Sequence, residues 1–568
     1  MTSEREQART LVCVPIMVED VEGALRRAGE AADAGADLVE FRVDGLLGGS
    51  SGGGAGEGDV VAGLVSRCRL PCVVTCRSAS EGGLYDGDDA ERVAMYERVT
   101  AGVREGEHAP RYIDVEHAAY ARSANLRQKV NLGVEHPGQV RGVSTGLVLS
   151  FHDFKERPAD LSRRVLAMSS EPACAVVKVA YRARSLRDNL EAFEAVRGAI
   201  KPTIALAMGE FGLMSRVLAP KFGGFLTFAS LAGGEETAPG QPSIGELLGQ
   251  YRFRAIGRRT AVYGVIGWPV GHSMSPLVHN AGFGAVGFDG VYLPLPVASG
   301  GDAEGAYASF KASVLELVHD EHLDFRGASV TIPHKENLVR LARERGWALD
   351  AVSAGIGAGN TLSVERDGAG RFVSARVFNT DAPAVAACVL EAAGRSDLAG
   401  VTAAVIGAGG VGRAAAYALA DAGARVVVFN RDLERAAQVA SEVSRGLGGG
   451  RVVVAEPMGR LAETDAGVFV NGTPVGMSGG PDPGGCVIPA VVLEAGGNRR
   501  AAPIVLDTVY NPVRTPLLAA AGRAGWRTVD GVSMFVRQAE AQFWAWTGVE
   551  PPGGLFDRLV RERLALKG

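Results

Sequence analysis

Residues 233–280 read GGEETAPGQPSIGELLGQYRFRAIGRRTAVYGVIGWPVGHSMSPLVHN, and two different sequence patterns meet in this stretch. On its amino-terminal side, short apolar runs alternate with helix-length segments. On its carboxyl-terminal side, an apolar run at 263–266 opens into a turn rich in serine. The Arg-rich piece 251–260 between them is typical of a linker. We therefore expect one domain over residues 10–250, a linker over 251–260 and a second architecture from residue 261 onward.

The overall composition indicates a globular chain with more than one domain. The 568 residues are too many for one hydrophobic core, and a net charge of −5 gives no field that attracts nucleic acid. No apolar run approaches the about 18 residues that a membrane span requires. The N-terminal MTSEREQART lacks the apolar centre of a secretory signal, and seven cysteines without paired CxxC spacing predict reduced thiols and no metal site. We expect a cytoplasmic protein, or a plastid stromal one if the source is plant-like.

Eight short runs rich in β-branched residues precede the linker, and helix-length segments separate most of them. They are residues 11–18, 37–44, 71–77, 111–116, 146–153, 174–181, 203–209 and 224–229. A strand followed by a helix, repeated eight times in about 220 residues, is the pattern of a parallel (β/α)8 barrel. The sequence therefore predicts an α/β fold that begins with a TIM barrel.

Polar residues interrupt these apolar runs near their carboxyl ends. In a parallel barrel the carboxyl ends form one face, and active sites lie on that face. We expect Arg42 and Arg77, with Arg216 from a later segment, to bind an acidic substrate because a guanidinium matches a carboxylate. The polar residues at the predicted strand ends are Glu40, Arg42, Asp44, Arg77, Asp114, Glu116, His152, Asp153 and Lys178.

Lys178 lies inside the apolar run AVVKVA. A lysine in a barrel strand must reach solvent, pair with a carboxylate, or exist as a free amine whose pKa burial has lowered. One interpretation is a structural ion pair with Glu116 or Glu40. The other is an amine that attacks a ketone, with His152 on the preceding strand close enough to move protons.

These residues belong to motifs that resemble type I 3-dehydroquinate dehydratases over nearly all of residues 10–250. The motifs are EFRVD at 40–44, TCR at 75–77, YIDVE at 112–116, SFHDF at 150–154, VKV at 177–179, MG at 208–209, SR at 215–216 and APGQ at 238–241. The resemblance implies that Lys178 forms an imine with the substrate ketone, that His152 moves the protons and that Glu116 orients His152. It implies substrate contacts from Glu40, Arg42, Arg77, Arg216, Thr237 and Gln241.

Two residues after the lysine depart from that family's pattern. Tyr181 and Arg182 stand where small residues are usual. We expect their bulk to narrow the substrate pocket.

After the linker, the stretch GHSMSPLVHN at 271–280 places Ser275 before Pro276. This order predicts a helix with Ser275 as its N-cap and Pro276 at its first position. Hydroxyls and N–H groups at a helix N-terminus suit a carboxylate, although ordinary capping explains the same pattern. Further on, Lys335 in SVTIPHK and Asp381 in NTD follow apolar runs. A lysine and an aspartate that enter one cleft form an acid/base pair.

Residues 401–412, VTAAVIGAGGVG, lead into a helical segment at 413–422 and a second apolar run at 424–430. A strand, a glycine turn, a helix and a strand in this order predict a dinucleotide-binding Rossmann domain. The second run ends in Asn430 and Arg431, where an NAD site places an acidic residue. A guanidinium there can bind a 2′-phosphate, which favours NADP(H) as the cofactor. The pyrophosphate is expected on the helix N-terminus, against Gly407, Ala408, Gly409, Gly410, Val411 and Gly412.

The motifs HSMSP, TIPHK, GNT, NTD, GAGGVG and VYNP occur in this order, and residues 261–568 resemble shikimate dehydrogenases. The resemblance implies a substrate-binding catalytic domain over 261–382, a Rossmann domain over 383–534 and helices at 535–568 that return to the substrate domain. It implies that Lys335 and Asp381 form a catalytic dyad. The implied substrate contacts are Ser273, Ser275, Thr331, Asn360, Tyr510 and Gln538, and Thr473, Met477 and Gly531 would lie near the nicotinamide.

The two resemblances share a metabolite, because the product of the dehydratase is the substrate of the dehydrogenase. The whole chain thus resembles bifunctional shikimate-pathway enzymes that act on 3-dehydroquinate, 3-dehydroshikimate and shikimate. We expect a monomer, since fusion removes one reason for the two activities to associate. Two alternatives remain: the second half could prefer quinate, or the chain could sense these metabolites without turnover. Retention of both Ser275 and Thr331 favours shikimate, and retention of Lys178 and Lys335 favours catalysis.

Overall fold

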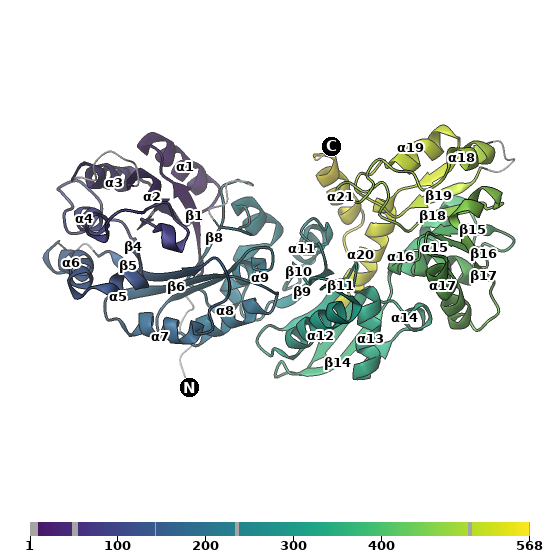
Figure 1. The fold of residues 1–568 in the computed structure, drawn as a ribbon, viewed down its shortest axis with the longest axis horizontal. Helices are drawn as coiled ribbons and strands as arrows, with labels where there is room; N and C mark the ends of the chain where they lie inside the picture. Colours follow the sequence, from purple (N-terminus) through teal and green to yellow (C-terminus); the bar gives the residue numbers. More distant parts are fainter. Residues whose placement is uncertain (1–8, 48–54, 142–143, 233–237, 498–501, 567–568) are drawn as a thin grey trace. The chain divides into compact units, whose positions relative to one another are not determined.

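The computed structural model of the chain describes residues 9–47, 55–141, 144–232, 238–497 and 502–566. These residues form two compact units, with the boundary between Thr260 and Ala261. Figure 1 shows the ribbon of both units, coloured along the sequence. Within this part of the chain, none of the helices combines the length and the apolar composition needed to cross a membrane.

Eight parallel strands form the centre of the first unit, in the order β7-β6-β5-β4-β3-β2-β1-β8. The N–H of Phe225 donates to the carbonyl oxygen of Thr203 at 3.0 Å, so a backbone bond links the start of β8 to β7 and the sheet nearly closes. The predicted (β/α)8 barrel is therefore confirmed. The strands are β1 Leu11–Met17, β2 Leu38–Arg42, β3 Cys72–Thr75, β4 Tyr112–Glu116, β5 Gly146–Asp153, β6 Cys174–Arg182, β7 Thr203–Met208 and β8 Leu226–Phe228.

Helices alternate with these strands and surround them (Figure 1). In the first helix, the Asp20 carboxylate accepts the N–H of Gly23 at 2.7 Å, and the buried Ala24, Ala28 and Ala31 share one helical face. The helices are α1 Val21–Asp33, α2 Asp44–Leu47, α3 Ala55–Arg67, α4 Asp89–Val99, α5 His117–Arg122, α6 Ala124–Arg141, α7 Leu161–Ser170, α8 Asp188–Arg197, α9 Leu213–Val217 and α10 Ala219–Phe222. The remaining described helical segments of the first unit are the 3₁₀ helices η1 Ala79–Glu81 and η3 Phe253–Ala255 and the π-helix η2 Glu246–Gln250.

Apolar side chains that point inward fill the barrel. Because successive strand residues alternate between the two faces, their neighbours pack outward against the helices. Leu206 and Phe228 belong both to this filling and to the lining of the pocket described below, so the filling forms the floor of that pocket. The inward cluster consists of Cys13, Leu38, Val73, Val148, Val176, Ile204, Leu206, Leu226 and Phe228.

The second unit begins with a lobe built on a six-stranded mixed sheet, in the order β10-β9-β11-β13-β14-β12. We call this part the first lobe. Both β11 and β14 pair antiparallel with β13, so their carboxyl ends lie at the same edge of the sheet. The strands are β9 Ala261–Gly267, β10 Gly290–Pro296, β11 Phe325–Val330, β12 Ala348–Leu349, β13 Thr361–Arg366 and β14 Phe372–Phe378; the helices are α11 Ser275–Ala285, α12 Ala303–His319, α13 Lys335–Arg345 and α14 Ala351–Ile356.

The second lobe has six parallel strands in the order β17-β16-β15-β18-β19-β20. This is the 3-2-1-4-5-6 order of a doubly wound Rossmann fold, as the sequence predicted. The strands are β15 Thr402–Ile406, β16 Arg425–Asn430, β17 Val453–Pro457, β18 Val468–Asn471, β19 Ile504–Asp507 and β20 Arg527–Val529. The helical elements are α15 Asp381–Ala393, α16 Gly410–Asp421, α17 Leu433–Gly446, η4 Met458–Glu463, α18 Ala490–Gly497 and α19 Pro516–Arg523.

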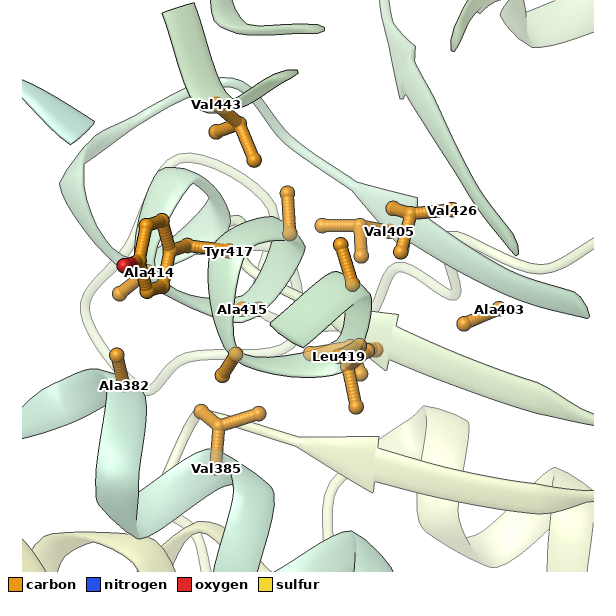
Figure 2. Close-up of a cluster of buried hydrophobic side chains, with 14 of the residues drawn as sticks. Ala382, Val385, Ala403, Val405, Ala414, Ala415, Tyr417, Leu419, Val426 and Val443 are labelled. Atoms are coloured by element: carbon orange, nitrogen blue, oxygen red, sulfur yellow. The ribbon is translucent and has the colours of Figure 1, made fainter. Parts of the chain in front are cut away.

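Small apolar residues join α15 to α16 (Figure 2). Ala382 and Val385 of α15 and Ala414 and Ala415 of α16 are buried in one cluster with strand residues such as Val405. Alanine side chains let two helices approach closely. The packing therefore places the amino ends of both helices, Asp381 and Gly410, on the same side of the second lobe.

The last two helices, α20 Gly531–Thr547 and α21 Leu555–Ala565, return to the first lobe. The indole N–H of Trp546 in α20 donates to the carbonyl oxygen of Leu362 in β13 at 3.1 Å. Phe543 and Phe556 are buried against Phe283 of α11. Side chains that follow the Rossmann strands thus complete the core of the first lobe.

Candidate active sites

Five of the nine polar residues predicted at the strand ends of the barrel line one pocket, namely Glu40, Arg42, Arg77, His152 and Lys178, whereas Asp44, Asp114, Glu116 and Asp153 are not part of its lining. Thr237, predicted to contact substrate, lies outside the described residues. Glu81 was not predicted, and its signal in the sequence is weak: an acid four residues after Arg77, followed by two glycines. The lining residues are Glu40, Arg42, Arg77, Glu81, Gly82, His152, Phe154, Lys178, Ala180, Leu206, Met208, Arg216, Phe228, Ala238 and Gln241.

Lys178 projects from β6 into this pocket and is 6% exposed. Its Nζ donates to Oε1 of Glu40 at 3.1 Å and to Oδ2 of Asp114 at 2.9 Å, and it lies 4.6 Å from the centroid of the Phe228 ring. Of the two carboxylates expected from the sequence, Glu40 is a partner, whereas Asp114 takes the place proposed for Glu116. The amine is thus held at a fixed point above the apolar floor.

His152 and Glu81 form a pair beside the lysine. Oε2 of Glu81 lies 3.1 Å from Nδ1 of His152 and accepts the backbone N–H of His152 at 3.0 Å. Burial, and after it the charges of Arg77 and Lys178, lowers the pKa of His152 well below its ordinary value. Burial raises the pKa of Glu81 to about 7. A neutral imidazole whose Nδ1 bonds to a carboxylate presents Nε2 as a base.

The predicted role of Glu116 is corrected by this geometry. Its Oε1 accepts the backbone N–H of Ser78 at 2.8 Å, and its carboxylate forms ion pairs with Arg92 and Arg77. Glu116 therefore fixes the loop after β3 and does not bond to His152. The position of Glu116 at a strand end did not reveal that Glu81, and not Glu116, bonds to His152. The partner of Glu116 is Arg92, which comes from α4 through a tertiary contact.

The arginines of the pocket differ in their partners. Arg42 makes a two-pronged bond to Asp44 at 2.9 Å and 2.9 Å, while Arg77 donates to Ser150 Oγ at 2.8 Å and pairs with Asp114 at 2.9 Å. Burial raises the pKa of Asp114, but the charges of Arg77 and Lys178 outweigh it and hold that pKa well below its ordinary value. Asp114 therefore stays ionised beneath the lysine.

The prediction that Tyr181 narrows this pocket is wrong. Of the described side chains of β6, Lys178 and Ala180 line the pocket. Tyr181 faces the other way and is fully buried, and its hydroxyl donates to the carbonyl oxygen of Asp188 in α8 at 2.6 Å. The alternation of strand residues separates the two faces. Arg182 ends the strand and is exposed to solvent.

In the second unit, Lys335 and Asp381 meet at the edge shared by β11 and β14. Nζ of Lys335 donates to Oδ2 of Asp381 at 2.5 Å, and both side chains are buried. Lys335 is the first residue of α13, and Asp381 is the first residue of α15. Thr331 lies directly after β11, in the segment that leads to Lys335. The structure therefore brings the predicted pair together.

The serine-rich turn differs in one detail from the prediction. The helix α11 begins at Ser275 with Met274 as its N-cap, and Oγ of Ser273 accepts the N–H of Ser275 at 3.2 Å. Ser273 therefore provides the local cap that was predicted for Ser275. Ser275 is buried at the helix start, and Pro276 lies within the first two helical positions.

A buried amide network holds the residues around Asn360. Oδ1 of Asn360 accepts the N–H of Thr380 at 2.8 Å, and its Nδ2 donates to Oγ1 of Thr380 at 2.9 Å. Gln542 of α20 was not predicted. Its Nε2 donates to Oγ1 of Thr361 at 2.9 Å, and its Oε1 accepts from Ser329 at 2.7 Å. Gln538, one turn earlier in α20, donates to the carbonyl oxygen of Phe535 at 3.0 Å.

The glycine turn after β15 has the shape that a dinucleotide pyrophosphate needs. Gly407 has a φ of +108°, which favours glycine, and a Cβ on Gly412 would lie 2.0 Å from the carbonyl oxygen of Gly407. A Cβ on Gly410 would lie 2.8 Å from Cδ of Lys335, whereas a Cβ on Gly409 would meet nothing within 4 Å. The turn thus opens onto the N-terminus of α16, where an anion is stabilised.

The remaining predicted cofactor residues lie at the carboxyl ends of the Rossmann strands. Asn430 ends β16, with Arg431 exposed directly after it, and Thr473 and Met477 follow β18. Gly531 begins α20, and a Cβ there would lie 2.3 Å from the carbonyl oxygen of Val509. Tyr510, predicted to contact substrate, packs against Phe535 with ring centroids 5.0 Å apart. In doubly wound sheets, ligands bind at this edge.

Comparison with known families gives a match for each of the two units. Residues 12–258 match the type I 3-dehydroquinase family, residues 265–362 the shikimate dehydrogenase substrate binding domain, and residues 390–465 the shikimate / quinate 5-dehydrogenase family. A bifunctional 3-dehydroquinate dehydratase/shikimate dehydrogenase, chloroplastic, from Arabidopsis thaliana is 34% identical over 564 residues, covering 97% of this chain and 84% of that protein. The chain belongs to this bifunctional family. Membership in the bifunctional dehydratase/dehydrogenase family assigns a dehydratase to the barrel and a dehydrogenase to the second unit.

Other relatives of this bifunctional family member match most of the chain or its second half. A pentafunctional AROM polypeptide from Malassezia globosa is 32% identical over 538 residues, covering 92% of this chain and 30% of that protein. A shikimate dehydrogenase (NADP(+)) from Anaeromyxobacter dehalogenans is 40% identical over 307 residues, covering 54% of this chain and 97% of that protein. A solved shikimate dehydrogenase in complex with NADP+ is 29% identical, covers 54% of this chain and 97% of that chain, and has a TM-score of 0.46.

Proposed function

We propose that this chain dehydrates 3-dehydroquinate to 3-dehydroshikimate in its barrel and reduces that product to shikimate with NADPH in its second unit. The observation that carries the proposal is the presence, in each unit, of a buried lysine in direct contact with ionisable partners. Lys178 lies beside Glu40, Asp114 and the His152–Glu81 pair, and Lys335 lies against Asp381 and the glycine turn.

In the barrel, the amine of Lys178 attacks the ketone carbon once it has given up its proton, and loss of water from that adduct forms an imine. The imine acidifies the neighbouring carbon, from which Nε2 of His152 removes a proton to give an enamine. His152 then returns a proton to the leaving hydroxyl, which departs as water. Hydrolysis of the imine releases the enone product and restores the amine. Glu81 stabilises the imidazolium that exists between the two proton transfers.

Substrate contacts in the barrel are assigned to polar residues of the pocket lining. We assign the substrate carboxylate to Arg216, because a guanidinium in this lining matches a carboxylate. Arg216 is buried in the pocket lining, next to Gln241. We assign the contacts with the substrate hydroxyl groups, and the pocket walls around these groups, to Gln241, Thr237, Glu40, Arg42 and Arg77.

In the second unit, the glycine turn from Gly407 to Gly412 would hold the pyrophosphate of NADP(H), and Arg431 with Asn430 its 2′-phosphate. The bound cofactor supplies the two-electron reduction of the ketone. Lys335 donates a proton, or its charge, to the oxygen on which negative charge develops, and Asp381 keeps its ammonium group in place. Ser273 and Ser275 are assigned to the substrate carboxylate, and Thr331, Asn360, Tyr510 and Gln538 to its hydroxyl groups.

The domain limits proposed from the sequence correspond to this assignment of one activity to each unit. We assign residues 10–250 to the dehydratase, 261–382 to the shikimate-binding part, 383–534 to the cofactor-binding part and 535–568 to helices that complete the shikimate-binding part. We also propose a monomer without a nucleic-acid partner, in the cytoplasm or in a plastid stroma. Sedimentation of the purified chain would test its oligomeric state, and imaging of a tagged chain would test its location.

One coupled assay tests both activities. Purified protein receives 3-dehydroquinate and NADPH, and the absorbance of the reduced nicotinamide is followed. Steady loss of that absorbance is expected, and Lys178→Ala or Lys335→Ala should each abolish it. Adding 3-dehydroshikimate should restore the signal in Lys178→Ala but not in Lys335→Ala. The absence of NADPH consumption by the unaltered chain with either substrate would contradict the proposal for the second unit.

The alternative of a quinate preference is tested in the reverse direction. Quinate carries one more hydroxyl beside its carboxylate, so its site needs more room near Ser275 and Thr331. Both of these hydroxyl residues are present, which favours shikimate. We expect faster reduction of NADP+ with shikimate than with quinate, and the opposite order would replace the assigned substrate.

A further inference from the structure

The first and second lobes of the second unit also meet at Arg413, a residue to which neither motif resemblance gives a role. It lies in the first turn of α16, three residues after Gly410, and is 3% exposed. We propose that Arg413 is a positioning residue for the dehydrogenase reaction, which holds the segment carrying Asn360 and the first turn of α13 against the cofactor helix. This inference rests on the function proposed above for the second unit.

Arg413 contacts three elements besides its own helix. Its Nη1 donates to the carbonyl oxygen of Ile356, the last residue of α14, at 3.4 Å. The same nitrogen forms an ion pair with Glu442 of α17. Its Nε lies 3.5 Å from Oε1 of Glu336 in α13. One buried guanidinium therefore joins two helices of the first lobe to two helices of the second.

The contact with Ile356 reaches the substrate residues through a short, well-bonded segment. Asn360 follows Ile356 by four positions. Within this segment the N–H of Gly359 donates to the carbonyl oxygen of Lys335 at 3.0 Å, and the carbonyl oxygen of Asn360 accepts the N–H of Val330 at 2.7 Å. A displacement of Ile356 is thus transmitted to Asn360 and to the backbone of Lys335.

The contact with Glu336 reaches the catalytic lysine directly, because Glu336 follows Lys335 in the same helical turn. The Nε–H of Arg413 has no hydrogen-bond acceptor among the described residues, and the Glu336 oxygen at 3.5 Å is placed to become one. The first turn of α13 must approach α16 by about half an ångström to complete a bond of ordinary length. Such an approach carries Lys335 toward the glycine turn, where its Cδ already passes close to Gly410.

The helices around this cluster pack closely at a second point. A Cβ on Gly446 of α17 would lie 2.6 Å from the Cα and from the carbonyl oxygen of Gly355 in α14. Beside this crossing is a polar cavity, which Arg413 lines together with Arg445 of α17. Arg445 donates to Oγ of Ser441 in its own helix at 3.3 Å. Arg445 therefore offers a matched arginine in the same cavity, without a bond to the Ile356 segment.

The test compares Arg413→Met with Arg445→Met. Both are assayed for NADPH-dependent reduction of 3-dehydroshikimate, at a temperature where circular dichroism shows each variant to be folded. Dehydratase activity of the barrel in the same samples reports the concentration of active chain. We expect Arg413→Met to lower kcat at least tenfold with less than a twofold change in the KM for NADPH. Arg445→Met should stay within twofold of the unaltered chain in both constants.

Arg413→Lys and Glu336→Gln keep the test decisive if Arg413→Met does not fold. Arg413→Lys keeps the positive charge but loses the planar guanidinium with its several N–H donors. Glu336→Gln removes the negative charge beside Lys335. Each should lower kcat about threefold to tenfold. A kcat within twofold of the unaltered chain in the folded Arg413 variants, or an equal loss in Arg445→Met, would overturn the inference. A loss confined to the KM for NADPH would assign Arg413 to cofactor binding and overturn it too. If the unaltered chain consumes no NADPH, the proposed function itself fails.

Discussion

A single carboxylate oxygen, Oε2 of Glu81, contacts His152 twice: it lies 3.1 Å from Nδ1 of the ring and accepts the backbone N–H at 3.0 Å. Backbone and ring of the histidine are therefore fixed by one group. The carboxylate comes from η1 after β3, and the histidine comes from β5. The base that we propose for the dehydratase site is thus oriented by a loop rather than by a neighbouring strand.

Replacing Glu81 by glutamine should weaken the base without disturbing the lysine. The amide keeps the shape of the side chain, but it removes the charge that stabilises the imidazolium. We expect kcat for 3-dehydroquinate to fall about tenfold to a hundredfold. Mass spectrometry after borohydride reduction should still detect substrate attached to Lys178. Glu116→Gln is the control, since Glu116 bonds to Ser78, Arg92 and Arg77, and a larger loss in this variant would reverse the two assignments.

The dehydratase rate should depend on the ionisation of Glu81. Burial raises the pKa of Glu81 to about 7, and burial lowers the pKa of His152. His152 is therefore neutral across the range in which Glu81 loses its proton, and only the ionised Glu81 stabilises the imidazolium. We expect kcat/KM for 3-dehydroquinate to rise with pH through about 7. In Glu81→Gln this rise should disappear, and its persistence would assign it to another group.

A methyl group on Gly410 should impair the dehydrogenase more than it impairs the fold. Its Cβ would meet Cδ of Lys335 at 2.8 Å, and that atom belongs to a flexible side chain that can move aside. Movement of Lys335 away from Asp381 should lower kcat for 3-dehydroshikimate at least tenfold, which corresponds to about 1.4 kcal/mol. Steady-state kinetics and calorimetry of Gly410→Ala would check both statements.

The adjacent glycines give contrasting outcomes. In Gly412→Ala the new Cβ would lie 2.0 Å from a backbone oxygen of Gly407, so we expect a loss of unfolding free energy of about 1–3 kcal/mol or more. In Gly409→Ala the Cβ meets nothing within 4 Å of the protein. This variant should unfold at nearly the same temperature but bind NADPH more weakly, and unchanged binding would move the pyrophosphate away from Gly409.

Tyr181→Phe should affect stability alone. The hydroxyl donates to the carbonyl oxygen of Asp188 at 2.6 Å on the side of β6 that faces α8. Losing this buried bond should cost about 1 kcal/mol, which calorimetry detects as a decrease in Tm of about 2–4 °C for a unit of this size. Dehydratase kcat and KM should stay unchanged. A change in KM for 3-dehydroquinate would show that Tyr181 does influence the pocket.

Arg431 should set the preference for the phosphorylated cofactor. Replacement by methionine removes the charge at the end of β16, and we expect the KM for NADPH to rise about tenfold or more while that for NADH changes little. Arg425, exposed at the start of the same strand, provides a matched control. An equal effect of Arg425→Met would indicate a general electrostatic attraction instead of a specific phosphate contact.

The architecture could be predicted from the sequence because its signals are local. Eight β-branched runs bounded by helix-length segments gave the barrel, and one glycine-rich turn between two apolar runs gave the Rossmann lobe. The outward orientation of Tyr181 was predictable too, since it lies an odd number of residues from the inward Lys178 and strand residues alternate. The bulk of Tyr181, at a position where the resembling family has a small residue, suggested a narrowed pocket, and the alternation contradicts this prediction.

The features of the sites that could not be predicted from the sequence depend on contacts between distant segments of the chain. Glu116 lies at the end of a barrel strand, as a partner of His152 would, but Arg92 of α4 binds its carboxylate. Glu81 lies outside any predicted strand, and only the path of its loop brings it to His152. Gln542 and Arg413 lie in helices whose sequence pattern indicates packing alone, yet each bonds to segments that are more than fifty residues away.

The alanine contacts between α15 and α16 have a consequence for how the dehydrogenase site responds to heat. Ala382, Ala414 and Ala415 have no side-chain torsion to populate, so this part of the interface loosens less through rotamer exchange than a leucine-rich interface does. The position of Asp381, the first residue of α15, is thereby fixed relative to α16. The spacing between the Asp381 carboxylate, which we propose as catalytic, and the glycine turn should accordingly change little with temperature, so that warming accelerates the reaction until the lobe itself unfolds.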